Sequence, residues 1–206
     1  GKIHAMGHDW GANIVCMASK MRPEQFKSIG MFSVPDPRLF VKVSASRVPY
    51  QFVRSWYIFY HQVPYFPEQG LYGGEFLRKV LPKSYLNYNP ERVELISSTF
   101  RDMKVVKGAL GYYRSLFNIV DGIKLALGMA SPDTEMYVET GALTVPVPTL
   151  ALAGKHDRAI DPKLFEYSVN DNNFPAGHEL HYIESGHFVH HEQGEQVSSL
   201  IQAFVE

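Results

Sequence analysis

The sequence predicts an α/β protein in which a mostly parallel sheet is flanked by helices and interrupted by a helical insertion. Three observations support this prediction. Short apolar segments of strand length alternate with helix-like segments near both ends of the 206-residue chain. An aspartate between glycines, in Gly7-His8-Asp9-Trp10-Gly11, separates the first strand-like segment from the first helix-like segment. Between residues 38 and 141, aromatic residues recur at helical spacing, and no apolar run resembles a buried strand.

The core elements are expected in the order strand, helix, strand, insertion, strand, helix, strand, helix. Residues 2–6 and 26–34 indicate strands on either side of a helix at residues 11–20, whose small residues allow close packing on a sheet. Pro35-Asp36-Pro37 then ends the second strand.

The rest of the core follows the insertion. Residues 149–154 (Thr-Leu-Ala-Leu-Ala-Gly) form a continuous apolar run, which is typical of a parallel strand buried on both faces. Residues 179–183 indicate a last strand. An amphipathic helix is expected at residues 192–205, because its apolar residues recur on one face.

The middle of the chain predicts a helical cap, or lid. Its candidate helices lie at residues 48–60, 73–81, 90–100 and 105–117. We therefore expect a core built from residues 1–37 and 142–206, and a cap built from residues 38–141.

Three polar residues each follow a predicted strand, where the active sites of open parallel sheets collect. They are Asp9, Asp157 and His187, in the order nucleophile, acid, histidine. Glycines on both sides of Asp9 allow a sharp reversal that holds its carboxylate out. A carboxylate can attack an sp³ carbon directly, and a histidine paired with Asp157 can take a proton from water. Taken singly, each residue also fits a turn, a loop cap or a satisfied loop histidine.

Composition excludes several other classes. A net charge of −1 gives no indication of nucleic acid or of an anionic membrane surface as a partner. The apolar runs are shorter than the roughly 20 residues that span a bilayer. The single cysteine, Cys16, is expected to be a buried small hydrophobe, which fits a cytoplasmic protein. His187, His190 and His191 lack the carboxylate or cysteine that would complete a metal set, so we expect no metal and no cofactor.

These motifs make the chain resemble the epoxide hydrolase branch of the α/β-hydrolase superfamily, which neighbours the haloalkane and haloacetate dehalogenases. The resemblance runs through essentially the whole chain and includes the two cap motifs that distinguish this branch. The matching segments are residues 7–11 (the nucleophile elbow), residues 55–64 with Pro67-Glu68, Gly111-Tyr112-Tyr113-Arg114, residues 153–157 and Ser185-Gly186-His187.

The resemblance implies a mechanism. Asp9 would open a small apolar epoxide to give an aspartyl ester, and water activated by His187 would release a vicinal diol. Tyr57 and Tyr113 of the cap would donate hydrogen bonds to the epoxide oxygen, which suits the alkoxide that develops there. Trp10 would supply a backbone N–H to the oxyanion, and His8 would line the pocket. Tyr57 and Tyr113 could instead be ordinary amphipathic residues in a seam between cap and core.

The sequence departs from the family at its start, because only eight residues precede Asp9. The family's first strands, and its His-Gly-x-Pro-like loop with the second oxyanion donor, have no counterpart here. We therefore expect the isolated 206-residue chain to be poorly active. The possible protein partners are a second chain that supplies the missing strands, or a second copy of this chain in a homodimer.

Two other functions also stay open. A haloalkane or haloacid dehalogenase would use the same nucleophile, although a haloacetate enzyme calls for arginines where Trp10 and Asn13 stand. A non-catalytic fragment or binding module is the alternative outside enzymes.

Overall fold

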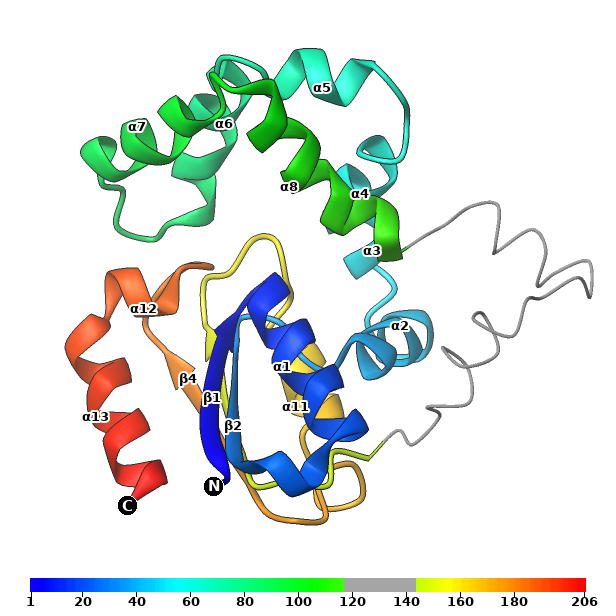
Figure 1. The fold of residues 1–206 in the computed structure, drawn as a ribbon, viewed down its shortest axis with the longest axis vertical. Helices are drawn as coiled ribbons and strands as arrows, with labels where there is room; N and C mark the ends of the chain where they lie inside the picture. The colour runs from blue at the N-terminus through cyan, green and yellow to red at the C-terminus, as the bar shows by residue number, and fades with distance from the viewer. Residues whose placement is uncertain (117–143) are drawn as a thin grey trace, which may run out of the picture. The chain divides into compact units, whose positions relative to one another are not determined.

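The computed structural model describes residues 1–116 and 144–206, and its strands form one parallel sheet (Figure 1). The strand order is β1-β2-β3-β4, so each strand pairs with its successor in the chain. Contacts divide the described residues into two compact units. The first comprises residues 1–54, 84–87 and 144–206, and the second comprises residues 55–83 and 88–116.

The first unit contains the sheet and its covering helices. Its elements are β1 (Ile3–His8), α1 (Trp10–Met21), the 3₁₀ turn η1 (Pro23–Gln25), β2 (Phe26–Phe32), α2 (Pro37–Ser46), α3 (Gln51–Arg54), β3 (Thr149–Gly154), α11 (Lys163–Ser168), β4 (His178–Ile183), α12 (Val189–Glu192) and α13 (Gly194–Val205).

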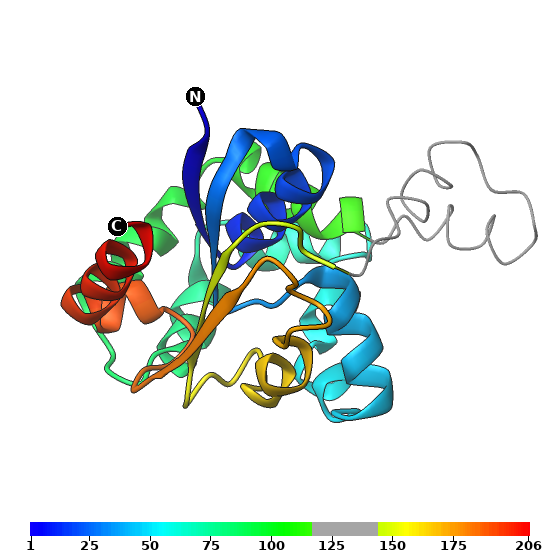
Figure 2. The same cartoon turned by 90° about the horizontal axis from the view of Figure 1, so that it is seen from below.

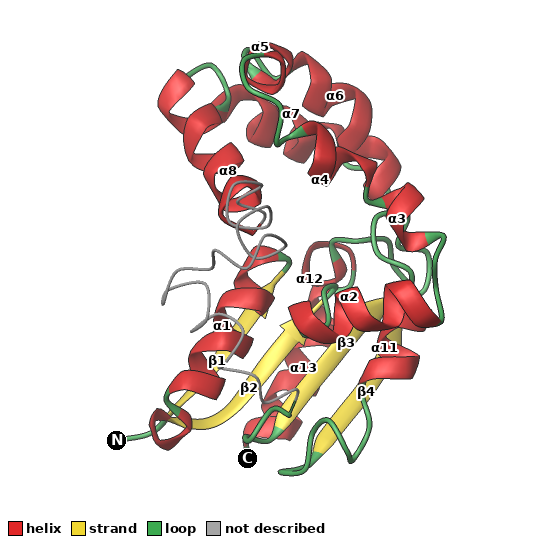
Figure 3. Cartoon of the chain, turned by 90° about the vertical axis from the view of Figure 1, so that its right-hand side faces the viewer, coloured by secondary structure: helices red, strands yellow, loops and turns green. Residues whose placement is uncertain are grey.

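Helices cover both faces of this sheet, as expected when parallel strands are joined by crossovers. Helices α1, α2 and α11 lie on one side of the strands, and α13 lies on the other (Figures 2 and 3). Successive residues of a strand point to opposite faces. In β3, Ala151 and Ala153 therefore pack in the cluster of α1, α2 and α11, whereas Leu150 and Leu152 pack with α12 and α13.

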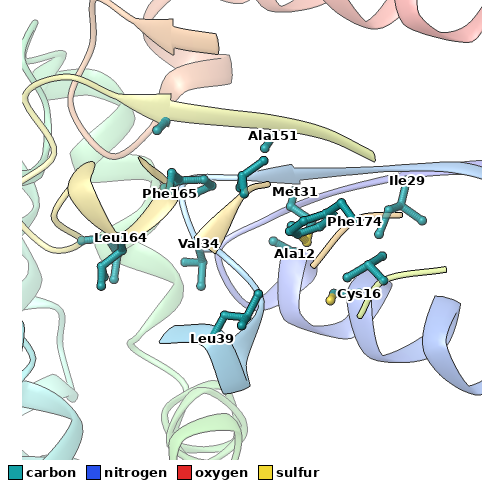
Figure 4. Close-up of a cluster of buried hydrophobic side chains, with 14 of the residues drawn as sticks. Ala12, Cys16, Ile29, Met31, Val34, Leu39, Ala151, Leu164, Phe165 and Phe174 are labelled. Atoms are coloured by element: carbon teal, nitrogen blue, oxygen red, sulfur yellow. The ribbon is translucent and has the colours of Figure 1, made fainter. Parts of the chain in front are cut away.

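The larger cluster forms the main core. Ile29 and Met31 of β2 lie with Cys16 of α1 and with Phe174, all buried (Figure 4). Each such large apolar side chain stabilises the fold by about 1.5–3 kcal/mol relative to exposure. The burial of Cys16 agrees with its expected role as a small hydrophobe, and it raises the pKa of the thiol well above its ordinary value.

Asp36 begins α2 and also ties it to α1. Its Oδ1 atom accepts hydrogen bonds from the backbone N–H groups of Arg38 (2.9 Å) and Leu39 (3.3 Å), and Pro37 stands at the first helical position. Its other oxygen forms a buried ion pair with Lys20 of α1. Pro35-Asp36-Pro37 therefore starts a helix as well as ending the strand before it.

The second unit is helical among the residues that the structure describes. Its elements are α4 (Trp56–Tyr60), α5 (Phe66–Leu71), α6 (Glu75–Val80), the 3₁₀ turn η2 (Leu81–Ser84), whose last residue packs in the first unit, α7 (Pro90–Thr99) and α8 (Met103–Leu116). Leu71, Val106 and Leu110 form its buried cluster.

The expected elements agree with these except in the cap region. The helix expected at residues 48–60 is broken at Ser55 into α3 and α4, which fall in different units. Residues 38–54, assigned to the cap from the sequence, pack in the first unit, because Leu39 and Val43 of α2 are buried in the core cluster. The cap's expected end near residue 141, and the last residue of the helix expected at 105–117, lie outside the described residues.

Helix length and apolarity bear on membrane insertion. None of the helices within residues 1–116 and 144–206 is both long and apolar enough to cross a bilayer.

Candidate active site

Asp9 stands at a strained turn between β1 and α1. Its φ of 53° and ψ of −119° place a non-glycine residue in a region that such residues rarely occupy, at a cost of about 1–3 kcal/mol. The turn is held by the Asp9 N–H, which donates to the Phe32 carbonyl at 3.0 Å, and by Asp9 O, which accepts from Ala12 N at 3.0 Å. The turn projects the side chain beyond the carboxyl end of the strand.

The two glycines of the turn have different roles, and this corrects the sequence-based account. A Cβ on Gly7 would lie 2.2 Å from the carbonyl oxygen of Gly11, so only glycine allows the chain to pass so close. A Cβ on Gly11 would meet nothing within 4 Å. Neither glycine has a positive φ, because Asp9 itself carries the reversal.

His187 lies between the two predicted carboxylates. Its Nε2 atom is 3.1 Å from Asp9 Oδ2, and its Nδ1 atom is 2.7 Å from Asp157 Oδ2. The side chains of Asp157 and His187 are buried, whereas 39 % of the Asp9 side chain is exposed. The structure therefore brings the three residues together, with the solvent-accessible carboxylate at the outer end.

The loop after β3 holds Asp157 in place. Its Oδ1 atom accepts from the N–H groups of Ala159 (2.8 Å) and Ile160 (3.0 Å), which leaves Oδ2 for His187. Arg54 donates to the Asp157 carbonyl at 3.1 Å. Because both oxygens are engaged, the carboxylate has a fixed orientation.

The backbone carbonyl of His187 is also fixed. It accepts from Ser33 Oγ at 2.6 Å and from His8 Nε2 at 2.9 Å. Since a carbonyl can only accept, His8 carries its proton on Nε2. Burial and the charge of His187 lower the pKa of His8 to about 4, which keeps its ring neutral. This contact supports the His187 loop, and the pocket role expected for His8 stays a prediction.

The pKa values of Asp9 and His187 shift in opposite directions. Burial alone would raise the pKa of Asp9, but the hydrogen bond and charge of His187 outweigh it and lower that pKa. Burial alone would lower the pKa of His187, but Asp157 and then Asp9 outweigh it and raise that pKa well above 6.5. Both shifts favour the ionised pair, a carboxylate on Asp9 and an imidazolium on His187.

Trp10 is the first residue of α1. A hydrogen bond from its backbone N–H is among the contributions that lower the pKa of Asp9. The N–H expected to bind an oxyanion therefore donates to the Asp9 carboxylate.

Tyr57 and Tyr113 lie together within the second unit, on α4 and α8. Their ring centroids are 5.9 Å apart and their planes are nearly perpendicular. Gln62 joins the two helices by donating to the carbonyls of Ile58 (3.2 Å) and Tyr113 (2.9 Å). Gln62 was not singled out from the sequence, and the structure gives it this bridging role.

Arg114 braces the same region. It donates to the carbonyls of His61 (3.1 Å) and Val63 (3.0 Å), and it pairs with Glu68 at 2.7 Å. His61 was not singled out from the sequence, yet its ring centroid is 4.5 Å from that of Tyr113. Neither of its buried ring nitrogens has a hydrogen-bond partner among the described residues.

In the part of the chain that the structure describes, no group of three or more His, Cys, Asp or Glu side chains could hold a metal ion.

Sequence comparisons place this arrangement among known proteins. No protein-family model matches the chain. Over 209 residues, all of this chain, it is 25 % identical to the AB hydrolase superfamily protein YfhM of Bacillus subtilis (strain 168), of which it covers 66 %. It is 24 % identical over 217 residues to epoxide hydrolase 4 of Homo sapiens, of which it covers 54 %. The chain thus spans about half to two thirds of these curated relatives.

Solved structures agree with the sequence comparisons. A mutant epoxide hydrolase from Bacillus megaterium superposes on 99 % of the chain with a TM-score of 0.72 at 18 % identity, and the chain covers 69 % of it. Potato (Solanum tuberosum) epoxide hydrolase I gives a TM-score of 0.68 at 22 % identity, with the same coverage. The chain has the α/β-hydrolase fold. Its resemblance to epoxide hydrolases, first identified from the motifs, is confirmed.

Proposed function

We propose that this chain carries the reacting groups of an epoxide hydrolase that opens a small apolar epoxide to a vicinal diol. The observation that carries the proposal is the hydrogen-bonded series Asp9, His187, Asp157 at a strained strand-to-helix turn. The similarity to epoxide hydrolases supports the substrate class. The proposal applies to the protein at full length, since the chain spans only part of its relatives.

In the first half-reaction, a carboxylate oxygen of Asp9 attacks the less hindered epoxide carbon. The bond from that carbon to the ring oxygen breaks, and the oxygen takes a proton from Tyr57 or Tyr113. The products are a hydroxyalkyl ester on Asp9 and a phenolate that the other tyrosine stabilises. No base is needed, because the nucleophile is already ionised.

In the second half-reaction, His187 takes a proton from water, and the oxygen of that water attacks the ester carbonyl. The Trp10 N–H donates to the resulting oxyanion. Collapse of the tetrahedral intermediate releases the diol and restores the Asp9 carboxylate. The imidazolium so formed pairs again with the Asp9 carboxylate, which completes the cycle.

The two half-reactions place different demands on His187. Paired with an ionised Asp9, its pKa is raised and the ring is an imidazolium, which cannot act as a base. Esterification removes the negative charge from Asp9 and with it two of the contributions that raise the pKa of His187. The pKa then falls, and the imidazolium gives its proton to the tyrosine phenolate. The neutral imidazole can accept a proton from water only once the ester exists.

A trapping experiment tests the proposal. His187→Gln incubated with styrene oxide, an apolar aryl epoxide, should accumulate a stable ester on the peptide that contains Asp9, detected by mass spectrometry. Asp9→Asn incubated in the same way should carry no adduct. Diol release by His187→Gln at the wild-type rate, or an adduct on another residue, would contradict the proposal.

The alternatives predict other products. A dehalogenase would release halide from a haloalkane and would have no use for the paired phenols of Tyr57 and Tyr113. A binding module would form no ester at all. The proposed partners are therefore an epoxide and water. A homodimer, a second chain that supplies further strands, and a cytoplasmic location stay predictions.

A further inference from the structure

We propose that Glu192 is a positioning residue for His187, which it serves by fastening residues 84–87 onto the loop that carries the histidine. We call residues 84–87 the strap. The strap begins at the last residue of η2 and precedes α7 in the sequence, but it packs in the first unit. The consequence for catalysis rests on the proposed function, whereas the positioning itself does not.

A single carboxylate holds both segments. Glu192 Oε2 accepts from the N–H groups of Leu86 (2.8 Å) and Asn87 (2.9 Å), and Oε1 accepts from Gly186 N at 2.9 Å. Hydrogen bonds to an ionised acceptor are about twice as strong as neutral ones. Gly186 immediately precedes His187, so the carboxylate acts on the histidine's own backbone.

The strap also contacts His187 directly. The His187 N–H donates to the Ser84 carbonyl at 2.7 Å. A Cβ on Gly186 would lie 2.4 Å from that same Ser84 oxygen and 2.8 Å from Leu86 N. The close approach therefore requires glycine at position 186, and it fixes the backbone on the N-terminal side of the histidine.

Aromatic stacking holds the residue on the C-terminal side of His187. Tyr85 of the strap is buried and stacks on Phe188, with ring centroids 4.5 Å apart and planes at 15°. Phe188 stacks in turn on His191, and the Tyr85 hydroxyl lies 3.3 Å from His191 Nδ1. Residues on both sides of His187 are thus held by the strap.

These contacts divide the task of orienting the histidine. Asp157 fixes the ring, while Glu192 and the strap fix the backbone from which the ring projects. Replacing the Glu192 carboxylate by an amide removes the negative charge. It also puts an NH2 group, which can only donate, opposite a backbone N–H that needs an acceptor. The His187 loop should then shift, and a misplacement of about 1 Å can cost about a hundredfold in rate.

The test compares Glu192→Gln with a matched control, Glu195→Gln, in the full chain. Glu195 is exposed on α13, three positions further on. In the wild type, the proton between His187 Nδ1 and Asp157 should give a low-field NMR signal, because the two atoms are only 2.7 Å apart. In Glu192→Gln this signal should broaden or disappear, and the amides of residues 86, 87 and 186 should exchange faster with solvent. Glu195→Gln should match the wild type in both measurements.

Kinetics separate positioning from general loss of structure. Only the second half-reaction needs His187 as a base, so Glu192→Gln should slow ester hydrolysis about tenfold or more and leave ester formation within about twofold. The ester fraction at steady state would then rise. Glu192→Asp keeps the negative charge on a shorter side chain, so its rate of ester hydrolysis should lie between those of the wild type and Glu192→Gln. This variant still tests the inference if Glu192→Gln folds poorly.

Clear results would overturn the inference. An unchanged low-field signal with unchanged amide exchange in Glu192→Gln would show that the carboxylate does not position His187. An equal slowing of both half-reactions would assign Glu192 a merely structural role. Failure of the proposed epoxide hydrolase function can be distinguished from failure of this inference. In that case the wild type would form no ester with the epoxide, but the NMR comparison would still test whether Glu192 positions His187.

Discussion

His187 Nε2 lies 3.1 Å from Asp9 Oδ2, so the proposed nucleophile and the proposed base share one hydrogen bond. The contact favours the ionised form of both residues, since the pKa of Asp9 is lowered and that of His187 is raised. Under the proposed mechanism, the same contact keeps the Asp9 carboxylate ready for attack and prevents His187 from acting as a base until the ester has formed.

The charge of Asp9 should be measurable in the titration of His187. In Asp9→Asn, the pKa of His187 should fall, because the hydrogen bond and charge of Asp9 both raise it in the wild type. NMR titration of the His187 ring measures the change, with Glu195→Gln as the control. Because the folded-state pKa lies above 6.5, the stability that His187 contributes is fully present below pH 6.5 and is lost as the pH rises through the folded pKa. An unchanged titration in Asp9→Asn would contradict the coupling.

The elbow glycines should respond unequally to the same substitution. Gly7→Ala should destabilise the protein by about 3 kcal/mol, because its Cβ would overlap the backbone of Gly11, which cannot move without displacing α1. Gly11→Ala should be neutral or stabilising by up to about 1 kcal/mol, since the position is helical and open. Urea unfolding of both variants measures the difference. Equal effects would refute this account of the turn.

Tyr57 and Tyr113 should act in ester formation alone. Tyr57→Phe and Tyr113→Phe each remove one hydroxyl and should slow ester formation about a hundredfold, while hydrolysis of an ester already formed changes little. The matched control is Tyr112→Phe, a half-exposed neighbour on α8, which should stay within about twofold of the wild type. Single-turnover kinetics with styrene oxide measures both steps. A comparable slowing of ester formation in Tyr112→Phe would contradict a specific role for Tyr57 and Tyr113.

His61 should limit the stability of the cap. Its ring nitrogens are buried without hydrogen-bond partners among the described residues, and burial together with the charge of Arg114 lowers its pKa to about 4. His61→Phe keeps the ring volume and removes both polar atoms, so it should stabilise the protein by about 1–2 kcal/mol. His61→Ala should instead destabilise it by about 2 kcal/mol, because packing on Tyr113 is lost.

The same substitution has a pH signature. Between pH 6.5 and about 4, the unfolded chain binds a proton at His61 that the folded chain does not, so the wild type loses stability as the pH falls through this range. Phenylalanine does not bind a proton, so the stability of His61→Phe lacks this pH dependence. The excess stability of the variant over the wild type should therefore increase as the pH falls. Thermal unfolding measured from pH 7 to pH 4 would reveal it, and a constant difference would count against a neutral, buried ring.

Elements with strong local signals could be predicted from the sequence. The apolar run at residues 149–154 is the strand β3 without change, and the order of Asp9, Asp157 and His187 after their strands anticipated their convergence. The proposed epoxide-opening mechanism cannot be predicted from the apolar run or from the order of the three residues, because neither specifies which bond reacts.

The misplaced features depend on contacts that local patterns do not encode. Helix α2 is amphipathic, and its pattern does not distinguish packing on the sheet from packing in a cap. The break at Ser55 falls inside a stretch rich in aromatic residues, whose pattern does not mark it. Glu192 acts across more than a hundred residues through backbone donors, so no residue type at positions 86 or 87 could have revealed it.

The strap has a consequence for engineering. Residues 84–87 are flanked on both sides by residues of the helical unit, yet they pack with the sheet-bearing unit. Exchanging residues 55–116 for the equivalent stretch of another hydrolase would therefore also replace the residues that support His187, the proposed general base. A chimera designed to change substrate choice would have to retain these four residues, or import a compatible partner for Glu192, to keep its turnover.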